Sequence, residues 1–254
     1  MKKQKEELIR LHKFLSSRGI GSRRYCEALI QKGSVFVNGK TAYLGMKIDP
    51  AQDRIVLEDR GKVLHKALKL RYLMLYKPYG YITSMSDPFS RPTIRELIPP
   101  TKERLFPIGR LDFQSEGLIL LTNDGDLAFG LSHPSSKVPK IYLVKVKGKP
   151  SLKLQTGLKK GIKLDDGWSA FDSMLEMKSR SSVNTWFKVT IHSGKNRIIR
   201  RMFLAIGHPV LKLKRINIAS VGIGPLKPKE WRYLTSQEIR ILKEYANKSM
   251  DIDS

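Results

Sequence analysis

Hydrophobic side chains recur at helical spacing near the start of the chain, from Leu8 to Leu15, and two glycines follow closely. Apolar positions three and four residues apart form one face of an α-helix, and glycine commonly ends it. A second helix is predicted after Ser22, whose hydroxyl can cap the first turn, and Gly33 marks its end. The chain therefore begins with two short predicted helices.

Short strands follow these helices. Residues 35–37 form an apolar run, and the Asn38-Gly39 pair after them is a strong short-range signal for a tight hairpin turn. Residues 53–57 predict a further strand. Two helices and a few strands predict a small, mainly helical module over residues 1–57.

From Arg71 onward the pattern changes to repeated strands. Strands interleaved with helices, without a regular β-α alternation, predict an α+β fold class. We expect a mixed α/β domain with a central, mainly antiparallel sheet at residues 71–246, after a charged linker at 58–70 and before a polar tail at 247–254. The strands are predicted at residues 72–76, 81–84, 118–121, 141–146, 186–191 and 216–218, and the helices at 126–132, 196–206 and 236–246.

The charge of the chain narrows the class of partner. The 254 residues include 48 Lys and Arg against 23 Asp and Glu, which gives a formal net charge of +25. A balance this basic favours a polyanion, and nucleic acid is the expected partner because Lys and Arg neutralise its phosphates. No apolar run has the length of a membrane span, and no signal-peptide core precedes the first helix. We expect a cytoplasmic protein without membrane contact.

The sequence offers no motif for a metal or a cofactor. The single cysteine, Cys26, excludes an intrachain disulfide and a zinc site with several thiolates. No Walker loop and no G-x-G-x-x-G segment occur, and the five histidines are scattered. We therefore expect no bound metal and no cofactor.

Two groups of basic residues are candidates for contact with RNA. The first lies on or beside the two N-terminal helices, with Glu27 as the one acid among it. The second opens the helix predicted at 196–206 and has no acid within it, so its members repel one another unless an anion is near. A solvated charged face is the alternative for each group, but the imbalance favours an RNA-facing surface. The candidates are Lys13, Arg18, Arg23, Arg24 and Lys32 in the first group and, in the second, Lys195, Arg197 and Arg201 with the neutral amide Asn196 among them, where Arg200 is expected to turn inward.

Asp112 is the candidate for catalysis. It lies between Leu111 and Phe113, in a segment that joins two apolar stretches. A carboxylate held in such a place can act as a nucleophile or a base, provided that a cation keeps it ionised. The alternative is a turn aspartate that accepts a hydrogen bond from a nearby backbone N–H, and the residue pattern alone favours this alternative.

The segment around Asp112, residues 106–125, resembles the signature of the bacterial small- and large-subunit rRNA pseudouridine synthases. Ser115 and Ile198 depart from that family's pattern, where Thr and Gln are common. The start of the chain resembles the RNA-binding module shared with ribosomal small-subunit protein four, and the region from Arg71 resembles the catalytic domain. Further matches are LYKPYG at residues 75–80, RPT at 91–93, KIY at 140–142 and GKNRIIRRM at 194–202.

This resemblance implies an isomerase that converts one uridine of rRNA to pseudouridine without a metal or cofactor. It implies that Asp112 is the catalytic aspartate and that Tyr142 stacks against the target uracil, although a tyrosine in a strand also packs within a sheet. Arg200 would pair with Asp112 and hold it ionised through charge-assisted hydrogen bonds.

The same resemblance implies the partner and leaves rival functions to be tested. The expected partner is rRNA within a ribosomal subunit or an assembly intermediate, with the enzyme as a monomer. Large-subunit (23S) rRNA is favoured over small-subunit (16S) rRNA. The alternative function is a non-enzymatic RNA-binding or ribosome-assembly protein with a degenerate second domain. A methyltransferase would need a glycine-rich cofactor loop, and none is present in the sequence.

Overall fold

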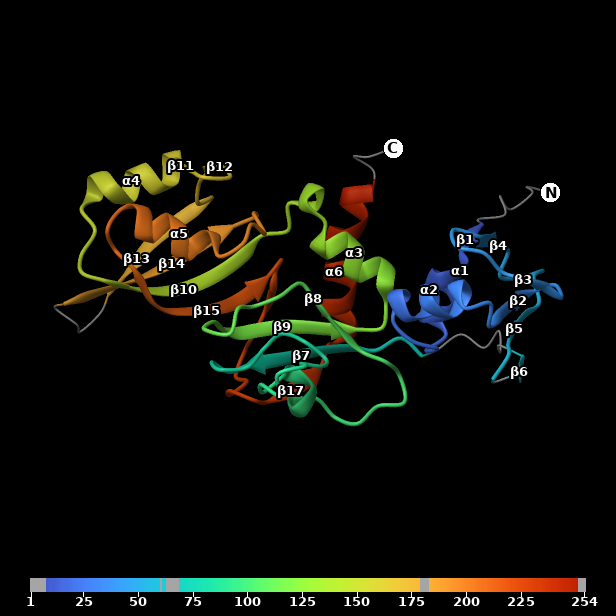
Figure 1. Cartoon of the computed structure of the whole chain (residues 1–254). Helices are drawn as coiled ribbons and strands as arrows, with labels where there is room; N and C mark the ends of the chain where they lie inside the picture. The colour runs from blue at the N-terminus through green and yellow to red at the C-terminus, as the bar shows by residue number, and fades with distance from the viewer. Residues whose placement is uncertain (1–7, 60, 63–68, 179–182, 251–254) are drawn as a thin grey trace. The chain divides into compact units, whose positions relative to one another are not determined.

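The computed structural model describes residues 8–59, 61–62, 69–178 and 183–250. The chain forms two compact units; Figure 1 shows the chain coloured by residue number. One unit comprises residues 1–70 with 101–104, and the other comprises residues 71–100 with 105–254. In the described part, no helix has the length and apolar character needed to cross a membrane.

The first unit joins two helices to short antiparallel strands. The Ser22 hydroxyl accepts a hydrogen bond from the Tyr25 backbone N–H at 3.0 Å, which confirms the predicted cap. Asn38 and Gly39 both have positive φ angles, of 50° and 80°, and form the predicted hairpin turn. The elements are α1 (Leu11–Ser17), α2 (Arg23–Gln31), a sheet in the order β3 (Lys40–Thr41), β2 (Val35–Val37), β5 (Ile55–Leu57) and β6 (Gly61–Lys62), and a separate pair of β1 (Ile9–Arg10) with β4 (Lys47–Ile48).

Two details of this unit differ from the sequence prediction. The first helix begins at Leu11 instead of Leu8, because the two residues before it pair with β4 as β1. β6 falls within the predicted linker, of which residues 60 and 63–68 lie outside the described residues. Cys26 packs in the core of the unit, as expected, and burial raises the pKa of its thiol to about 11.

The second unit is built on one large sheet. Neighbouring strands run antiparallel, except that β9 and β15 are parallel, which confirms the predicted mixed domain with a mainly antiparallel sheet. The path is β13 (Ser173–Met177), β14 (Asn184–Ile191), β10 (Lys140–Lys147), β15 (Val210–Ile218), β9 (Glu116–Thr122), β7 (Tyr72–Lys77) and β17 (Trp231–Tyr233), with β16 (Val221–Gly222) on β15 and β8 (Phe106–Ile108) on β9; β11 (Ile162–Leu164) and β12 (Gly167–Ser169) form a separate hairpin.

Helices cover parts of this sheet. α3 and α6 lie side by side over β7 and β9 (Figure 1), while α5 packs on β10 and β14. β7 and β9 are buried on both faces, so they form continuous apolar runs instead of alternating ones. The helices are α3 (Gly125–Ser132), α4 (Leu152–Lys160), α5 (Ile198–Ala205) and α6 (Ser236–Met250), with short 3-10 turns at Ile94–Leu97 and Pro134–Ser136.

Capping residues set the ends of two of these helices. The Asp124 carboxylate accepts hydrogen bonds from the first-turn backbone of α3. Thr235 and Glu238 form the reciprocal capping box expected at the start of α6, at 2.8 and 3.2 Å. α6 continues to Met250, beyond the predicted end at residue 246.

The strand predicted at residues 81–84 is wrong. Ile82 makes only an isolated bridge to Thr93, and the Thr83 side chain turns to the loop that precedes β9. α5 begins at Ile198 instead of residue 196, because Arg197 has a left-handed backbone with φ of 48°.

Candidate active site

The two halves of the large sheet meet where β9 and β15 pair in parallel. The contact is short and joins Glu116 and Gly117 to Lys214 and Arg215. Gly117 has a φ of 107°, and a Cβ there would lie 2.2 Å from the Arg215 carbonyl oxygen. Glycine is therefore required at this point, directly after the loop that carries Asp112.

A cavity of about 280 Å³ opens beside this junction. It is lined by the loop before β9, by the ends of β10 and β15 and by residues 193–199. Of the described residues that line it, one is an acid and five are basic. These charged residues are Asp112, Arg110, Lys140, Lys195, Arg197 and Arg215.

Short hydrogen bonds fix the backbone on either side of Asp112. The Thr83 hydroxyl donates to the Leu111 carbonyl at 2.7 Å and accepts from the Leu111 N–H at 3.1 Å. The Ser115 N–H donates to the Asp112 carbonyl at 3.0 Å and closes a turn. The half-buried Asp112 side chain thus stands on a loop whose backbone is tied to the segment after β7.

Lys77 supports the same loop from within the core, and sequence reasoning missed it. Its side chain is fully buried, and its ammonium donates to the carbonyls of Ser115 at 2.6 Å and Pro78 at 3.0 Å. Burial lowers the pKa of Lys77 to about 8, opposed by the negative charges of Asp112 and Glu116. The sequence signal that could have identified Lys77 is its position at the end of an apolar strand.

Arg200 binds the loop that carries Asp112. Its Nη2 donates to the Gln114 carbonyl at 2.6 Å and to the Ser115 hydroxyl at 3.4 Å. In the described part of the chain no ion pair joins its guanidinium to Asp112, so the expected direct hydrogen bond is absent from this structure. Burial and the charge of Arg197 lower the pKa of Arg200, whereas the charge of Asp112 raises it.

Tyr142 lines the cavity from β10. Its side chain is 9% exposed and packs in the same hydrophobic cluster as Leu111. The structure therefore brings Asp112 and Tyr142, thirty positions apart in the sequence, to one cavity. Arg200 lies behind the loop and does not line that cavity.

Comparison with known proteins assigns both units to families. A family model described as RNA pseudouridylate synthase matches residues 71–205, and a model of the S4 domain matches residues 9–55. The chain belongs to the RNA pseudouridine synthase family. It is therefore an isomerase, and the alternative of a non-enzymatic protein with a degenerate second domain is not supported.

Relatives resemble this synthase over almost the whole chain. An uncharacterized RNA pseudouridine synthase of Aquifex aeolicus is 42% identical over 91% of this chain and 92% of its own. Ribosomal large subunit pseudouridine synthase B of Bacillus subtilis is 38% identical over 94% of this chain and 97% of its own. A crystal structure of a pseudouridylate synthase superposes with a TM-score of 0.64 at 30% identity, over 92% of this chain and 99% of the other.

Two further basic residues of the synthase were missed as site residues. The Lys140 ammonium donates to the carbonyls of Val138 at 3.2 Å and His192 at 3.3 Å, and burial together with the charge of Arg215 lowers the pKa of Lys140 to about 8. Arg215 is 2% exposed, and its Nε donates to the Leu118 carbonyl at 2.8 Å. Its Nη2 is buried without a hydrogen-bond partner among the described residues.

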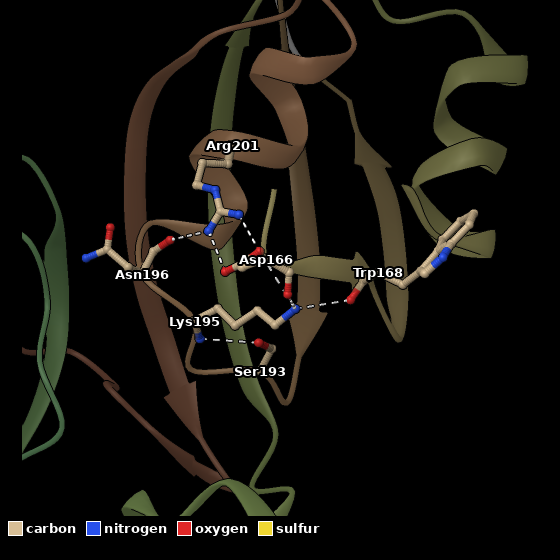
Figure 2. A network of polar contacts seen from close by, with 6 residues as sticks. All are labelled: Asp166, Trp168, Ser193, Lys195, Asn196 and Arg201. Carbon is tan, nitrogen blue, oxygen red and sulfur yellow. Dashed lines mark hydrogen bonds and ion pairs between the residues drawn. The ribbon is translucent and has the colours of Figure 1, made fainter. Parts of the chain in front are cut away.

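The second basic group has a counter-charge that the sequence argument did not find. The Arg201 guanidinium binds the Asp166 carboxylate through both terminal nitrogens, one of them at 2.9 Å (Figure 2). The Lys195 ammonium donates to the carbonyls of Asp166 at 2.9 Å and Trp168 at 3.3 Å. No acid occurs within the sequence segment of this group, but the β11–β12 hairpin brings Asp166 into contact with it. Asn196 and Arg197 remain exposed.

The first basic group lies on the α1 and α2 helices of the synthase. Arg23, Arg24 and Lys32 are exposed. Arg18 and Lys13 are half-buried, and the Arg18 guanidinium lies 4.8 Å from the centre of the Phe14 ring. The exposed members at the two ends of α2 are therefore those most open to a phosphate.

Proposed function

We propose that this synthase isomerises one uridine of ribosomal RNA, with Asp112 as the catalytic residue. The observation that carries the proposal is the position of Asp112, the acid among the charged residues of a cavity that Tyr142 also lines. The similarity to a protein named ribosomal large subunit pseudouridine synthase B, over nearly the full length of both chains, favours 23S rRNA over 16S rRNA.

The reaction suits the residues of this cavity. Isomerisation breaks the bond between ribose C1′ and uracil N1, turns the base and joins C1′ to C5, with no net redox change. A carboxylate at Asp112 can attack the ribose or the base, or remove a proton from the ribose. The rigid backbone on both sides of Asp112 holds the carboxylate in place for such a step.

Tyr142 offsets part of the cost of exposing the target base. A uridine in structured RNA must be flipped out of its stack, at a cost of about a few kcal/mol. Stacking on an aromatic ring returns roughly 1–3 kcal/mol for each base. We assign that contact to the Tyr142 ring, because Tyr142 on β10 and Asp112 line the same cavity.

Arg200 acts on the catalytic loop. Its two hydrogen bonds to Gln114 and Ser115 fix the loop, and the charge of Asp112 raises the pKa of Arg200, against the effect of burial. We assign to Arg200 a positioning role in place of direct pairing with the catalytic carboxylate.

Residues on and beside α1 and α2, together with Lys195 and the start of α5 at the rim of the cavity, dock the RNA. Phosphate contacts supply affinity and orientation without sequence information. The enzyme acts as a monomer in the cytoplasm, on a ribosomal subunit or an assembly intermediate, with residues 1–57 as the docking module, 71–246 as the catalytic domain and 58–70 as the linker between them. The proposed phosphate contacts are Lys13, Arg18, Arg23, Arg24, Lys32, Lys195, Asn196, Arg197 and Arg201.

A pseudouridine map of rRNA tests this function. Both rRNAs are mapped from cells with and without the protein, and a plasmid copy of the wild type serves as the control. We expect one position of 23S rRNA to lose its pseudouridine and to regain it with the plasmid. Loss at a 16S position moves the substrate to the small subunit, and an unchanged map in both rRNAs contradicts an rRNA substrate.

A further inference from the structure

We propose that Lys140 is the general base that takes the proton from C5 of the target uracil, a catalytic role separate from that of Asp112. The inference rests on the proposed function, because it places the target base in the cavity that Asp112 and Tyr142 line. Sequence reasoning gave Lys140 no role.

The reaction requires such a group. In uridine C5 carries a hydrogen, and in pseudouridine C5 is bonded to C1′ while N1 carries a hydrogen. After the C1′–C5 bond forms, C5 holds both the ribose and its original hydrogen. That hydrogen leaves as a proton, its bonding electrons restore the C5–C6 double bond, and N1 gains a proton. The balance needs a proton acceptor near C5 and no oxidant or reductant.

The sheet places Lys140 beside the stacking residue. Lys140 and Tyr142 are two positions apart on β10, so their side chains leave the same face of the strand. Their pairing with β14 is regular, opposite Ile191 and Val189, and the irregularity of this region lies in β15. Both residues line the cavity, so a base stacked on Tyr142 lies next to Lys140.

Lys140 loses its proton more readily than an exposed lysine does. Its ammonium has two backbone carbonyls as acceptors, and no carboxylate forms an ion pair with it among the described residues. Burial, with the positive charge of Arg215 on the neighbouring strand, lowers the pKa of Lys140 to about 8. Asp112 faces the same cavity from the loop, and the His192 ring is turned to Asp172 at 2.8 Å. An amine that titrates near neutral pH suits a general base.

The other basic groups near the cavity do not fit this role. Lys77 also has a pKa of about 8, but it is fully buried, binds the Ser115 carbonyl and does not line the cavity. Arg110, Arg197 and Arg215 line it, and arginine keeps its proton in proteins. Lys195 is held by the hairpin that carries Asp166.

An isotope effect at C5 tests the proposal. The substrate is an rRNA fragment with hydrogen or deuterium at C5 of the target uridine, in single-turnover reactions with wild type, Lys140→Arg and Lys140→Gln. Arginine keeps the positive charge but cannot accept the proton, so both variants should be slower by roughly 10²–10⁴-fold. Removal of the C5 proton then limits the rate, and a primary deuterium effect should appear or rise well above the wild-type value. This ratio is independent of the fraction of folded enzyme.

The control is Lys147→Gln, an exposed lysine at the far end of the same strand, which should keep the wild-type rate and ratio. A Lys140→Arg enzyme with wild-type rate overturns the proposal. A slow Lys140→Arg enzyme with an unchanged isotope ratio also overturns it, because Lys140 then only shapes or charges the cavity. A wild-type enzyme that forms no pseudouridine in rRNA overturns the proposed function together with this inference.

Discussion

At the scale of single residues, Arg200 is proposed to position the loop that carries Asp112 and not to bind RNA. Its guanidinium holds the loop at Gln114 and Ser115, so Arg200→Ala should loosen the loop and slow the single-turnover reaction by roughly 10²-fold, as a misplacement near 1 Å can do. Arg200→Lys keeps the charge without the planar guanidinium, so its rate should lie between those of the wild type and Arg200→Ala. RNA affinity, measured in parallel, should change little.

A matched control for Arg200 is the exposed Arg240 of α6, whose change to Ala removes the same charge from a helix that does not line the cavity. If Arg200→Ala weakened RNA binding and left the rate at saturating RNA unchanged, Arg200 would be a phosphate ligand instead.

The sequence could predict only part of the site at this scale. Asp112 and Tyr142 were found through the resemblance to a family, and the fold brings them to one cavity. Lys77, Lys140 and Arg215 were missed as site residues because their partners are backbone carbonyls, which no residue type marks. Their burial depends on strands that pair from distant parts of the chain.

At the scale of elements, the β11–β12 hairpin controls the charge of the segment before α5. Asp166 binds Arg201 and lies 3.8 Å from the Lys195 ammonium, which leaves less positive charge for RNA (Figure 2). Asp166→Ala should release Arg201 and remove the negative charge beside Lys195, which keeps its bonds to backbone carbonyls. The slope of log affinity against log salt should then steepen by roughly 0.7–0.9 for each new phosphate contact. Titrations with an rRNA fragment at several salt concentrations measure this slope.

The adjacent change Asp165→Ala removes an equal charge from the same turn and serves as the control, because the bonds of Arg201 to the Asp166 carboxylate are kept. An Asp166→Ala protein with the wild-type salt slope would mean that Arg201 and Lys195 do not meet phosphates.

Elements with local chemical signals were predicted well. The cap at Ser22, the turn at Asn38-Gly39 and the capping box at Thr235 each depend on neighbours within a few residues. Three strands were missed because they lack a clear apolar pattern. The first half of β15 contains lysines, and β13 and β17 lie at the two edges of the sheet, where β17 is also short. The strand predicted at 81–84 was wrong because of a contact distant in sequence. The Thr83 hydroxyl donates a hydrogen bond to the Leu111 carbonyl, and the segment does not pair with the sheet as a strand.

At the scale of the whole molecule, the net charge of +25 is shared by two units with different proposed tasks. Replacing the exposed Arg23, Arg24 and Lys32 by Gln should weaken rRNA binding and reduce the salt slope by roughly 0.7–0.9 for each lost contact. The rate at saturating RNA should persist, because the cavity lies in the other unit. Binding titrations and single-turnover rates together distinguish the two effects.

The control removes the same number of exposed cations from α6 and from the loop before β17, by changing Lys227, Arg240 and Lys243 to Gln. Equal losses of salt slope in both triple variants would show that overall charge, and not the α2 surface, docks the RNA.

The most direct test of the enzyme's chemistry is the pseudouridine formed at the mapped uridine by wild type and by Asp112→Asn. Asparagine keeps the shape of the side chain and removes its charge. With saturating enzyme and one rRNA fragment, we expect the wild type to convert the uridine and Asp112→Asn to form no pseudouridine while it binds the RNA with wild-type affinity. Pseudouridine formed by Asp112→Asn at a rate close to that of the wild type would contradict the role of Asp112 and move the chemistry to another residue.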